Sequence, residues 1–143
     1  MFSAPFASPA ARSRQVAGTY QQVGLQTAVG TASPHQLVAL LFDGFFAAVH
    51  RARGAMRASD IASKGAAIGQ AVSIVNEGLK AALDMRAGGK LAEDLSALYA
   101  YIGMRLTRAN LHNDEAALDE CLRLMKPLQE AWATIGPGGA SPR

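Results

Sequence analysis

The side chains most able to do chemistry in this sequence are three histidines and one cysteine, His35, His50, His112 and Cys121. Metal and haem sites among packed helices need Glu-x-x-His pairs, several inward-facing carboxylates or axial ligands. No histidine here has a glutamate three residues before it, and an exposed or helix-capping role is the simpler interpretation. The single cysteine excludes an internal disulfide and every Cys-x-x-Cys metal spacing. We therefore predict no metal and no cofactor.

The chain also lacks the sequence motifs of common enzymes. It has no Gly-x-Ser-x-Gly nucleophile turn and no glycine-rich loop that follows a strand and opens a helix. Cys121 falls on the apolar stripe of an expected helix, so we interpret it as a small core residue rather than a nucleophile. These observations predict that the protein is not an enzyme.

A group of cations on adjacent helical turns is the best candidate for binding nucleic acid. Its members are Arg51, Arg53, Arg57 and Lys64, and such a row could follow a phosphate backbone. However, cations also gather at the carboxyl end of a helix because they complement its dipole. No aromatic residues interleave for base stacking, and the net charge is only +3. We expect no nucleic-acid partner.

Composition and compartment signals point to helices in a reducing environment. Of 143 residues, 50% are hydrophobic but only 6% aromatic, which favours helix over strand. The first eleven residues lack the basic start of a secretory signal. The longest uncharged stretch, residues 15–42, contains five glutamines and a Ser-Pro pair, so no membrane insertion is expected. We predict a cytoplasmic protein.

Capping signals define the first two expected helices. Ser33-Pro34 with Gln36 matches a capping box, and the first helix then runs to about Arg57. Asp60 is the expected cap of a second helix that spans residues 61–84 with a regular apolar stripe.

Two further helices follow on similar grounds. Residues 86–89, Arg-Ala-Gly-Gly, end the second helix, and a third begins near Lys90. Asn113 is predicted to cap the fourth helix, in which Pro127 should produce a kink. Residues 136–139, Gly-Pro-Gly-Gly, stop it.

Short loops between long amphipathic helices predict an all-α, antiparallel, up-down-up-down four-helix bundle over residues 33–135. Residues 1–32 are expected to form a flexible segment, with a short helix around residues 14–29 only if something docks it. Residues 136–143 are expected to be a disordered tail.

The first helix has a wider apolar face than a plain bundle needs. Val38, Phe42 and Phe46 lie to one side of the seam formed by Leu37 and Leu41. An exposed band of this kind is costly unless a partner covers it. The alternative, weighted nearly equally, is that this helix is simply the most buried of the four.

Two more features suggest a groove. Val16 and Tyr20, in the segment before Ser33, have no evident role unless they lie in one, although a tail with scattered hydrophobic residues explains them as well. Tyr99 combines an aromatic ring with a polar tip, which suits a groove rim, although a half-buried packing role is the alternative.

An ordered set of short motifs runs through nearly the whole chain. They are Tyr20-Gln21, Ser33-Pro34, Leu37, Leu41-Phe42-Asp43-Gly44, Leu83-Asp84, Gly88-Gly89, Leu95, Leu98-Tyr99, Leu106, Ala109-Asn110 and Ala131-Trp132. As a set they resemble the FliS family of flagellin export chaperones. The chain departs from the family where Phe42 replaces a common tyrosine and where Met85-Arg86-Ala87 replaces a more acidic loop.

The resemblance implies a bundle that binds the disordered C-terminal segment of flagellin, prevents premature polymerisation and helps deliver flagellin to the export gate protein. It also implies that the N-terminal segment covers part of the groove until flagellin displaces it, with Val16 and Tyr20 in the cap. We expect five groove residues by position, Val38, Phe42, Phe46, Ile74 and Tyr99.

Two polar residues at family-matching positions, Asp43 and Asn110, are expected to make a buried contact that fixes helix register rather than to touch flagellin. The second hypothesis for the protein is a helical structural or regulatory module that self-associates through the same face into a homodimer.

Overall fold

The computed structural model describes residues 32–135. The proposed cap residues Val16 and Tyr20, the expected helix around residues 14–29 and the expected tail at residues 136–143 lie outside the described residues.

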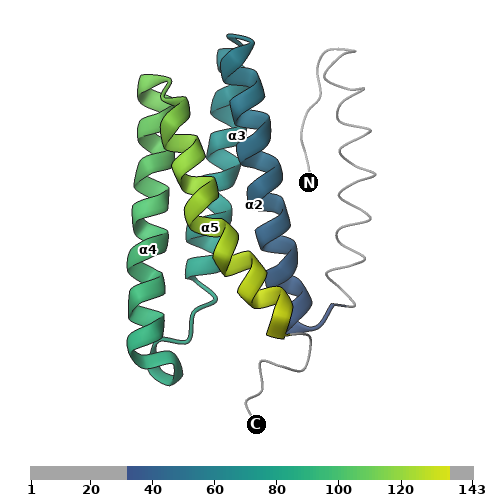
Figure 1. Ribbon diagram of the computed structural model, residues 1–143, viewed down its shortest axis with the longest axis vertical. Coiled ribbons are helices and arrows are strands. Elements are labelled where there is room, and N and C mark those ends of the chain that lie inside the picture. The colour runs from purple at the N-terminus through teal and green to yellow at the C-terminus, as the bar shows by residue number, and fades with distance from the viewer. Residues whose placement is uncertain (1–31, 136–143) are drawn as a thin grey trace, which may run out of the picture.

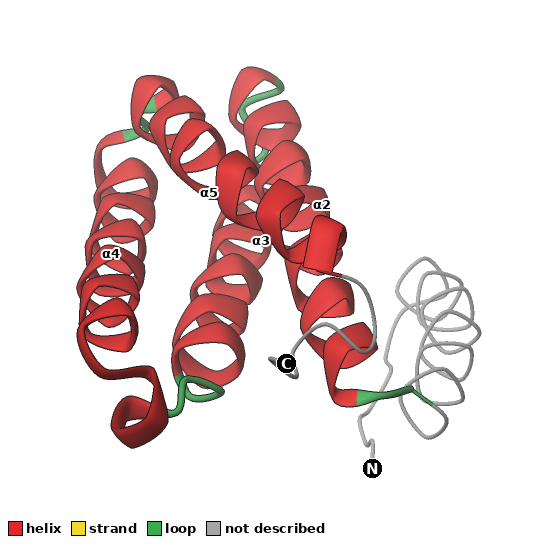
Figure 2. Ribbon diagram, turned by 60° about the horizontal axis from the view of Figure 1, so that its bottom comes forward, coloured by secondary structure: helices red, strands yellow, loops and turns green. Residues whose placement is uncertain are grey.

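Four helical rods make up the described part of the chain, in which no strand occurs. The elements are α2 (Pro34–Arg57), α3 (Ile61–Ser73), η1 (Ile74–Lys80), α4 (Met85–His112) and α5 (Glu115–Ile135). The π-helix η1 continues α3 without interruption, so the two form one rod. Successive rods alternate in direction, and α5 runs obliquely across the others (Figure 1). The view in Figure 2 shows the same all-helical arrangement, which confirms the predicted four-helix bundle.

Capping side chains begin the first two helices where the sequence predicted. The Gln36 amide N–H donates to Ser33 Oγ at 3.1 Å, and the Ser33 amide N–H donates to Gln36 Oε1 at 2.8 Å. This reciprocal pair satisfies two backbone donors that a helix start leaves without partners. Asp60 likewise accepts from the Ser63 amide at 3.1 Å.

The junction after the second rod differs from the prediction. Helical structure ends at Lys80 rather than at residue 84, because Asp84 caps the next helix by accepting from the amides of Arg86 and Ala87. One helical turn therefore precedes the expected start at Lys90. Gly89 then breaks α4 with φ 53° and ψ −130°, a conformation that favours glycine.

Asn113 also differs from the prediction, which has it capping the last helix. Its backbone is left-handed, with φ 54°, and its N–H donates to the Ala109 carbonyl, so Asn113 ends α4 instead of beginning α5. Asp114 caps the last helix through a 3.2 Å bond from the Ala117 amide. Pro127 lies inside α5, which continues through it to Ile135.

Gly78 of η1 lies against the Leu41 side chain of α2. A β-carbon on Gly78 would lie 2.9 Å from Leu41 Cδ2, a separation that real β-carbons do not adopt. A side chain at residue 78 would therefore require the end of the Leu41 side chain to shift.

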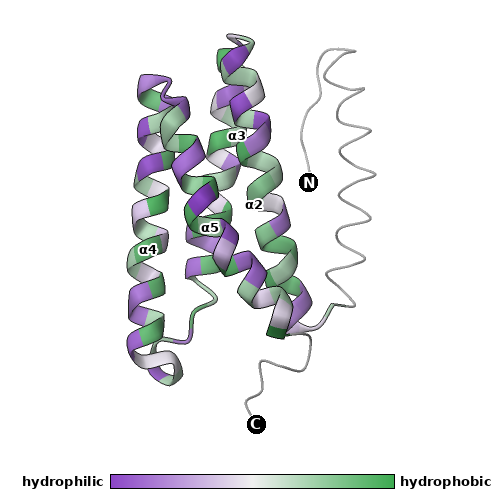
Figure 3. Cartoon of the chain, viewed as in Figure 1, coloured by the Kyte–Doolittle hydropathy of each residue, from purple (hydrophilic) through white to green (hydrophobic). Residues whose placement is uncertain are grey.

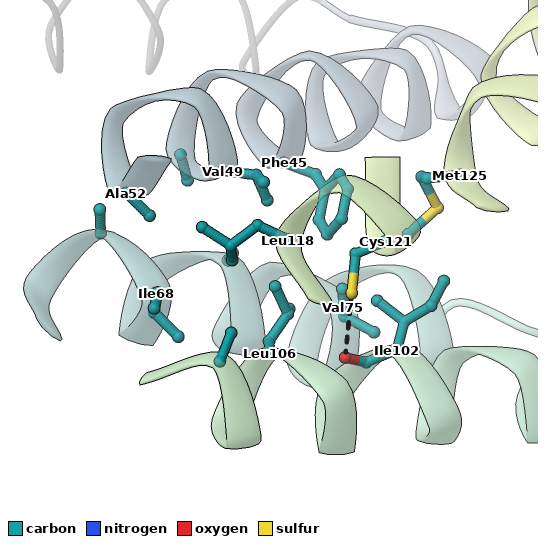
Figure 4. Close-up of a cluster of buried hydrophobic side chains, with 14 of the residues drawn as sticks. Phe45, Val49, Ala52, Ile68, Val75, Ile102, Leu106, Leu118, Cys121 and Met125 are labelled. Carbon is teal, nitrogen blue, oxygen red and sulfur yellow. Dashed lines mark hydrogen bonds between the residues drawn. The ribbon is translucent and has the colours of Figure 1, made fainter. Parts of the chain in front are cut away.

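The core lies between all four rods. Figure 4 shows it as interdigitated apolar side chains, and each rod carries hydrophobic and hydrophilic positions along its length (Figure 3). Large side chains with at most 2% exposure come from every rod: Phe45, Val49, Ile68, Val75, Ile102, Leu106, Leu118 and Met125. Cys121 belongs to this group, and its thiol lies 3.8 Å from the Ile102 carbonyl oxygen. The core interpretation of Cys121 is confirmed.

The cations considered for phosphate binding have partners inside the bundle. Arg53 pairs with Asp119 at 2.6 Å and Arg57 with Glu115, which joins α2 to α5. Arg51 donates to Gln70 of α3. Lys64 is only 7% exposed and lies near the start of α3, so complementing a helix carboxyl end in solvent does not explain its place.

Lys64 fastens two helices together. Its Nζ donates to the Asn110 carbonyl at 3.0 Å and to Asn113 Oδ1 at 2.9 Å, at the negative end of the α4 dipole. Replacing it by methionine, which keeps the length but not the charge, should lower the free energy of unfolding by about 2 kcal/mol. Urea denaturation measures this. Lys90→Met is the matched control, because the Lys90 ion pair with Asp94 is exposed and should contribute nothing measurable. Equal midpoints for the two variants would contradict the assignment.

Candidate functional site

An apolar cavity of about 290 Å³ opens at the end of the bundle where α2 and α4 begin and η1 and α5 end. All twelve lining residues are aliphatic or aromatic, and they come from α2, η1, α4, α5 and the turn before α4: Val38, Phe42, Leu79, Ala82, Leu83, Leu91, Leu95, Tyr99, Leu128, Ala131, Trp132 and Ile135. No lining side chain carries a charge. The cavity is slightly below the usual ~300–1,000 Å³ of small-molecule sites, so it suits a few apolar side chains of a partner.

A second cavity, of about 570 Å³, adjoins the first between α2 and η1. It shares Val38, Ala82 and Trp132 with the first, and adds Leu37, Leu41, Glu77 and the start of α2. We call the two cavities together the apolar groove. Its length along two helices and its apolar walls are typical of surfaces that bind an amphipathic helix.

Three of the five predicted groove residues meet at this groove. Val38 lines both cavities, while Phe42 and Tyr99 line the smaller one. The other two line neither. Phe46 packs edge-on against Phe45, with 5.4 Å between ring centroids, and lies under the Lys126 ammonium.

Ile74 points instead at the α2 backbone. Its Cδ1 lies 3.2 Å from the position that a β-carbon on Gly44 would occupy. The structure thus brings Ile74 to the junction of η1 and α2, away from both cavities.

The wall shared by the two cavities is held by a pair of residues that sequence reasoning did not join. The Trp132 indole N–H donates to the His35 carbonyl at 2.9 Å, and His35 Nε2 donates to the Trp132 carbonyl at 2.8 Å. Their rings also stack, with centroids 4.9 Å apart. We call this the His35–Trp132 clasp. His35 is 8% exposed, so the expectation of an exposed or merely capping histidine is wrong.

The clasp ties the first turn of α2 to the last turns of α5, where both helices border the groove. The only sequence signal for it is that the chain's single tryptophan falls near the end of the last expected helix. A buried indole normally finds a hydrogen-bond acceptor, but the sequence does not say which one.

The two predicted structural polar residues behave differently from each other. Asp43 is exposed, so a buried contact is wrong for it, although its Oδ1 accepts from Gln129 Nε2 at 3.1 Å and links α2 to α5. Asn110 takes part in a partly buried contact through its backbone carbonyl, which accepts from Lys64.

Burial makes Cys121 chemically inert. It raises the pKa of the thiol from 9.0 to about 12. Between pH 9 and about pH 12 the thiol is ionised in the unfolded chain but stays protonated in the native protein. The contribution of the thiol to the free energy of unfolding is therefore fully present below pH 9 and is lost as the pH rises. From about pH 8 to about pH 10.5, wild type should lose about 2 kcal/mol more of its free energy of unfolding than Cys121→Ala.

Urea denaturation of both proteins at the two pH values measures this difference. Burial also raises the pKa of Tyr99, but that contribution is present in both proteins and cancels. Parallel losses of stability in the two proteins would contradict the expected role of the thiol.

The described residues hold no group of three or more His, Cys, Asp or Glu side chains that could bind a metal ion. Within the same range, no helix combines the length and apolar character needed to cross a membrane.

Comparison with known proteins agrees with this geometry. A family model described as "Flagellar protein FliS" matches residues 16–139. The flagellar secretion chaperone FliS of Salmonella typhimurium is 46% identical over 118 residues, which cover 82% of this chain and 87% of the relative. That of Escherichia coli is 40% identical, with 79% and 83% covered, and FliSB of Pseudomonas aeruginosa is 42% identical, with 81% and 91% covered.

The matched region contains all five helical elements and both cavities. The family is one of chaperones rather than enzymes, in agreement with the prediction from the missing catalytic motifs. On these grounds, the chain belongs to the FliS family of flagellar secretion chaperones.

Proposed function

We propose that this protein binds the C-terminal segment of flagellin in the apolar groove, keeps flagellin subunits from polymerising in the cytoplasm and assists their delivery to the flagellar export gate. The observation that carries the proposal is the groove itself, two adjoining cavities walled almost entirely by apolar side chains. Such a surface is costly to leave in water.

The mechanism is folding of a disordered segment on a preformed surface. The flagellin segment forms amphipathic helices whose apolar side chains enter the cavities beside Val38 and Trp132. Burial of these side chains offsets the conformational entropy lost on ordering. A segment held in this way is withheld from other flagellin subunits.

In the same proposal the N-terminal segment, with Val16 and Tyr20, covers part of the groove in the free protein. Flagellin then binds only to uncovered molecules, so its apparent affinity is reduced by the uncovered fraction. Delivery follows when the loaded complex presents a surface to the export gate protein.

Calorimetric titration with the C-terminal segment of flagellin from the same organism tests the proposal. We expect saturable one-to-one binding with a negative heat-capacity change, because apolar surface is buried. A truncated protein that starts at Thr31 should bind more tightly if the cap exists. Absence of binding by both folded proteins would overturn the flagellin assignment.

The titration also separates this function from self-association. A homodimer that covers its own groove would sediment at twice the monomer mass without flagellin and would stay unchanged when the segment is added.

A further inference from the structure

One polar atom stands out in the wall of the smaller cavity. Among the lining side chains only Tyr99 and Trp132 carry a polar atom. The Trp132 indole N–H is already used, since it donates to the His35 carbonyl. The Tyr99 hydroxyl is therefore the one side-chain group of the cavity still able to make a hydrogen bond.

No group in residues 32–135 hydrogen-bonds to the Tyr99 hydroxyl. The residue is nevertheless only 4% exposed, and burial raises the pKa of its phenol. Buried polar groups in folded proteins are nearly always paired. No side-chain oxygen in the described range is both fully enclosed and unbonded, so this hydroxyl has some exposed surface, and Tyr99 lines the cavity.

A neighbour on the same helix makes the contrast clear. The Tyr101 hydroxyl donates to Glu120 Oε2 at 2.6 Å, and Arg105 donates to the other oxygen of that carboxylate at 2.7 Å. The Tyr101 hydroxyl thus links α4 to α5, whereas the Tyr99 hydroxyl makes no hydrogen bond within the described bundle.

We propose that Tyr99 determines specificity in the groove, by hydrogen bonding through its hydroxyl to a neutral polar side chain of the bound segment. This inference rests on the proposed function. We expect the hydrogen-bonding partner to be a Ser, Thr, Asn or Gln side chain, flanked in the bound segment by aliphatic residues that fill the apolar cavity. A carboxylate or ammonium group is excluded, because it would lose its hydration in the cavity without gaining a counter-charge. A wholly aliphatic segment would instead strip water from the hydroxyl and leave it unpaired.

A second lining residue, Trp132, makes this contact selective. The clasp fixes Trp132 by two hydrogen bonds and a ring stack, so the cavity does not easily widen to move an unsuitable side chain away from Tyr99. A site with a fixed unpaired polar group discriminates more strongly than a purely apolar one.

Tyr99→Phe tests the proposal, since it removes the hydroxyl and keeps the ring, and Tyr101→Phe is the matched control. Titration with the flagellin C-terminal segment should show about tenfold weaker binding for Tyr99→Phe, the usual consequence of losing one buried hydrogen bond and stranding its partner. Tyr101→Phe should bind like wild type.

A second arm locates the partner on the segment. Each Ser, Thr, Asn and Gln of the segment is replaced singly by Ala, Val or Leu. One replacement should weaken binding to wild type by about the same tenfold factor and have no further effect on Tyr99→Phe.

Thermal melting separates binding from folding, and Tyr99→Phe should melt at or above the temperature of wild type. A lower melting temperature would show that the hydroxyl has a structural partner and would overturn the inference. Binding of Tyr99→Phe at full strength would overturn it while leaving the flagellin assignment intact. Absence of binding by wild type would overturn both.

Discussion

Replacement of Leu91 by aspartate should abolish binding of the flagellin segment, with a loss of at least ~100-fold in affinity. Leu91 lines the smaller cavity from α4 and is 67% exposed in the free protein. A bound helix would cover the new carboxylate with apolar side chains. An ionised carboxylate buried without a partner is among the most unfavourable groups in an interface.

The fold should tolerate this change. Because Leu91 is largely exposed and follows the break at Gly89, aspartate there stays in water and lies near the positive end of the α4 dipole. Unchanged helicity and melting temperature would show that the binding loss is local.

Ile61→Asp is the matched control for Leu91→Asp. Ile61 is 75% exposed, also lies near the start of a helix and lines neither cavity of the groove. It should bind the segment like wild type. If both variants lost binding, general electrostatic repulsion would explain the result, and if neither did, flagellin would have to bind elsewhere.

Replacement of Phe45 by alanine should have the largest effect on stability, a loss of about 4 kcal/mol from the free energy of unfolding. The Phe45 ring has no exposed surface and lies at the centre of the core, facing α5 (Figure 4). Truncation removes its transfer free energy and leaves a cavity that the four rods cannot collapse to fill.

Phe46→Ala, one residue along, provides the comparison. Phe46 is half-buried at the edge of the core, so its loss should cost less than about 2 kcal/mol. Since Phe46 lines neither cavity, Phe46→Ala should leave flagellin binding unchanged. Urea denaturation and titration of the two variants measure both effects. Similar instability of both, or a binding loss only for Phe46→Ala, would contradict this assignment of the α2 faces.

The fold class and the starts of the first two helices could be predicted from the sequence. Ser33 and Asp60 each accept from an amide three residues away, so their effect is local and can be predicted from the sequence. The second helix, by contrast, is predicted too long, because Asp84 caps α4 but reads equally well as the last residue of a helix over 61–84. Periodicity identified the amphipathic faces and therefore the bundle.

The groove was only partly predictable. Val38, Phe42 and Tyr99 line the apolar groove, as the prediction requires, whereas Phe46 and Ile74 lie at packing surfaces. A stripe broad enough to include both Phe45 and Phe46 does not say which ring faces the core. That choice depends on how α5 crosses α2, which no spacing within one helix encodes.

The remaining parts of the site depend on contacts between residues far apart in the sequence. The clasp joins His35 to Trp132, 97 residues apart, and Lys64 reaches the end of α4 from α3. The unpaired hydroxyl of Tyr99 likewise becomes evident only from the packed bundle, where the other polar side-chain atom of the cavity, the Trp132 N–H, is already bonded to His35. Caps and stripes arise from contacts within one or two helical turns, which the sequence displays directly. Partners of buried polar groups are set by helix crossing and register, so they depend on the packing of the whole bundle.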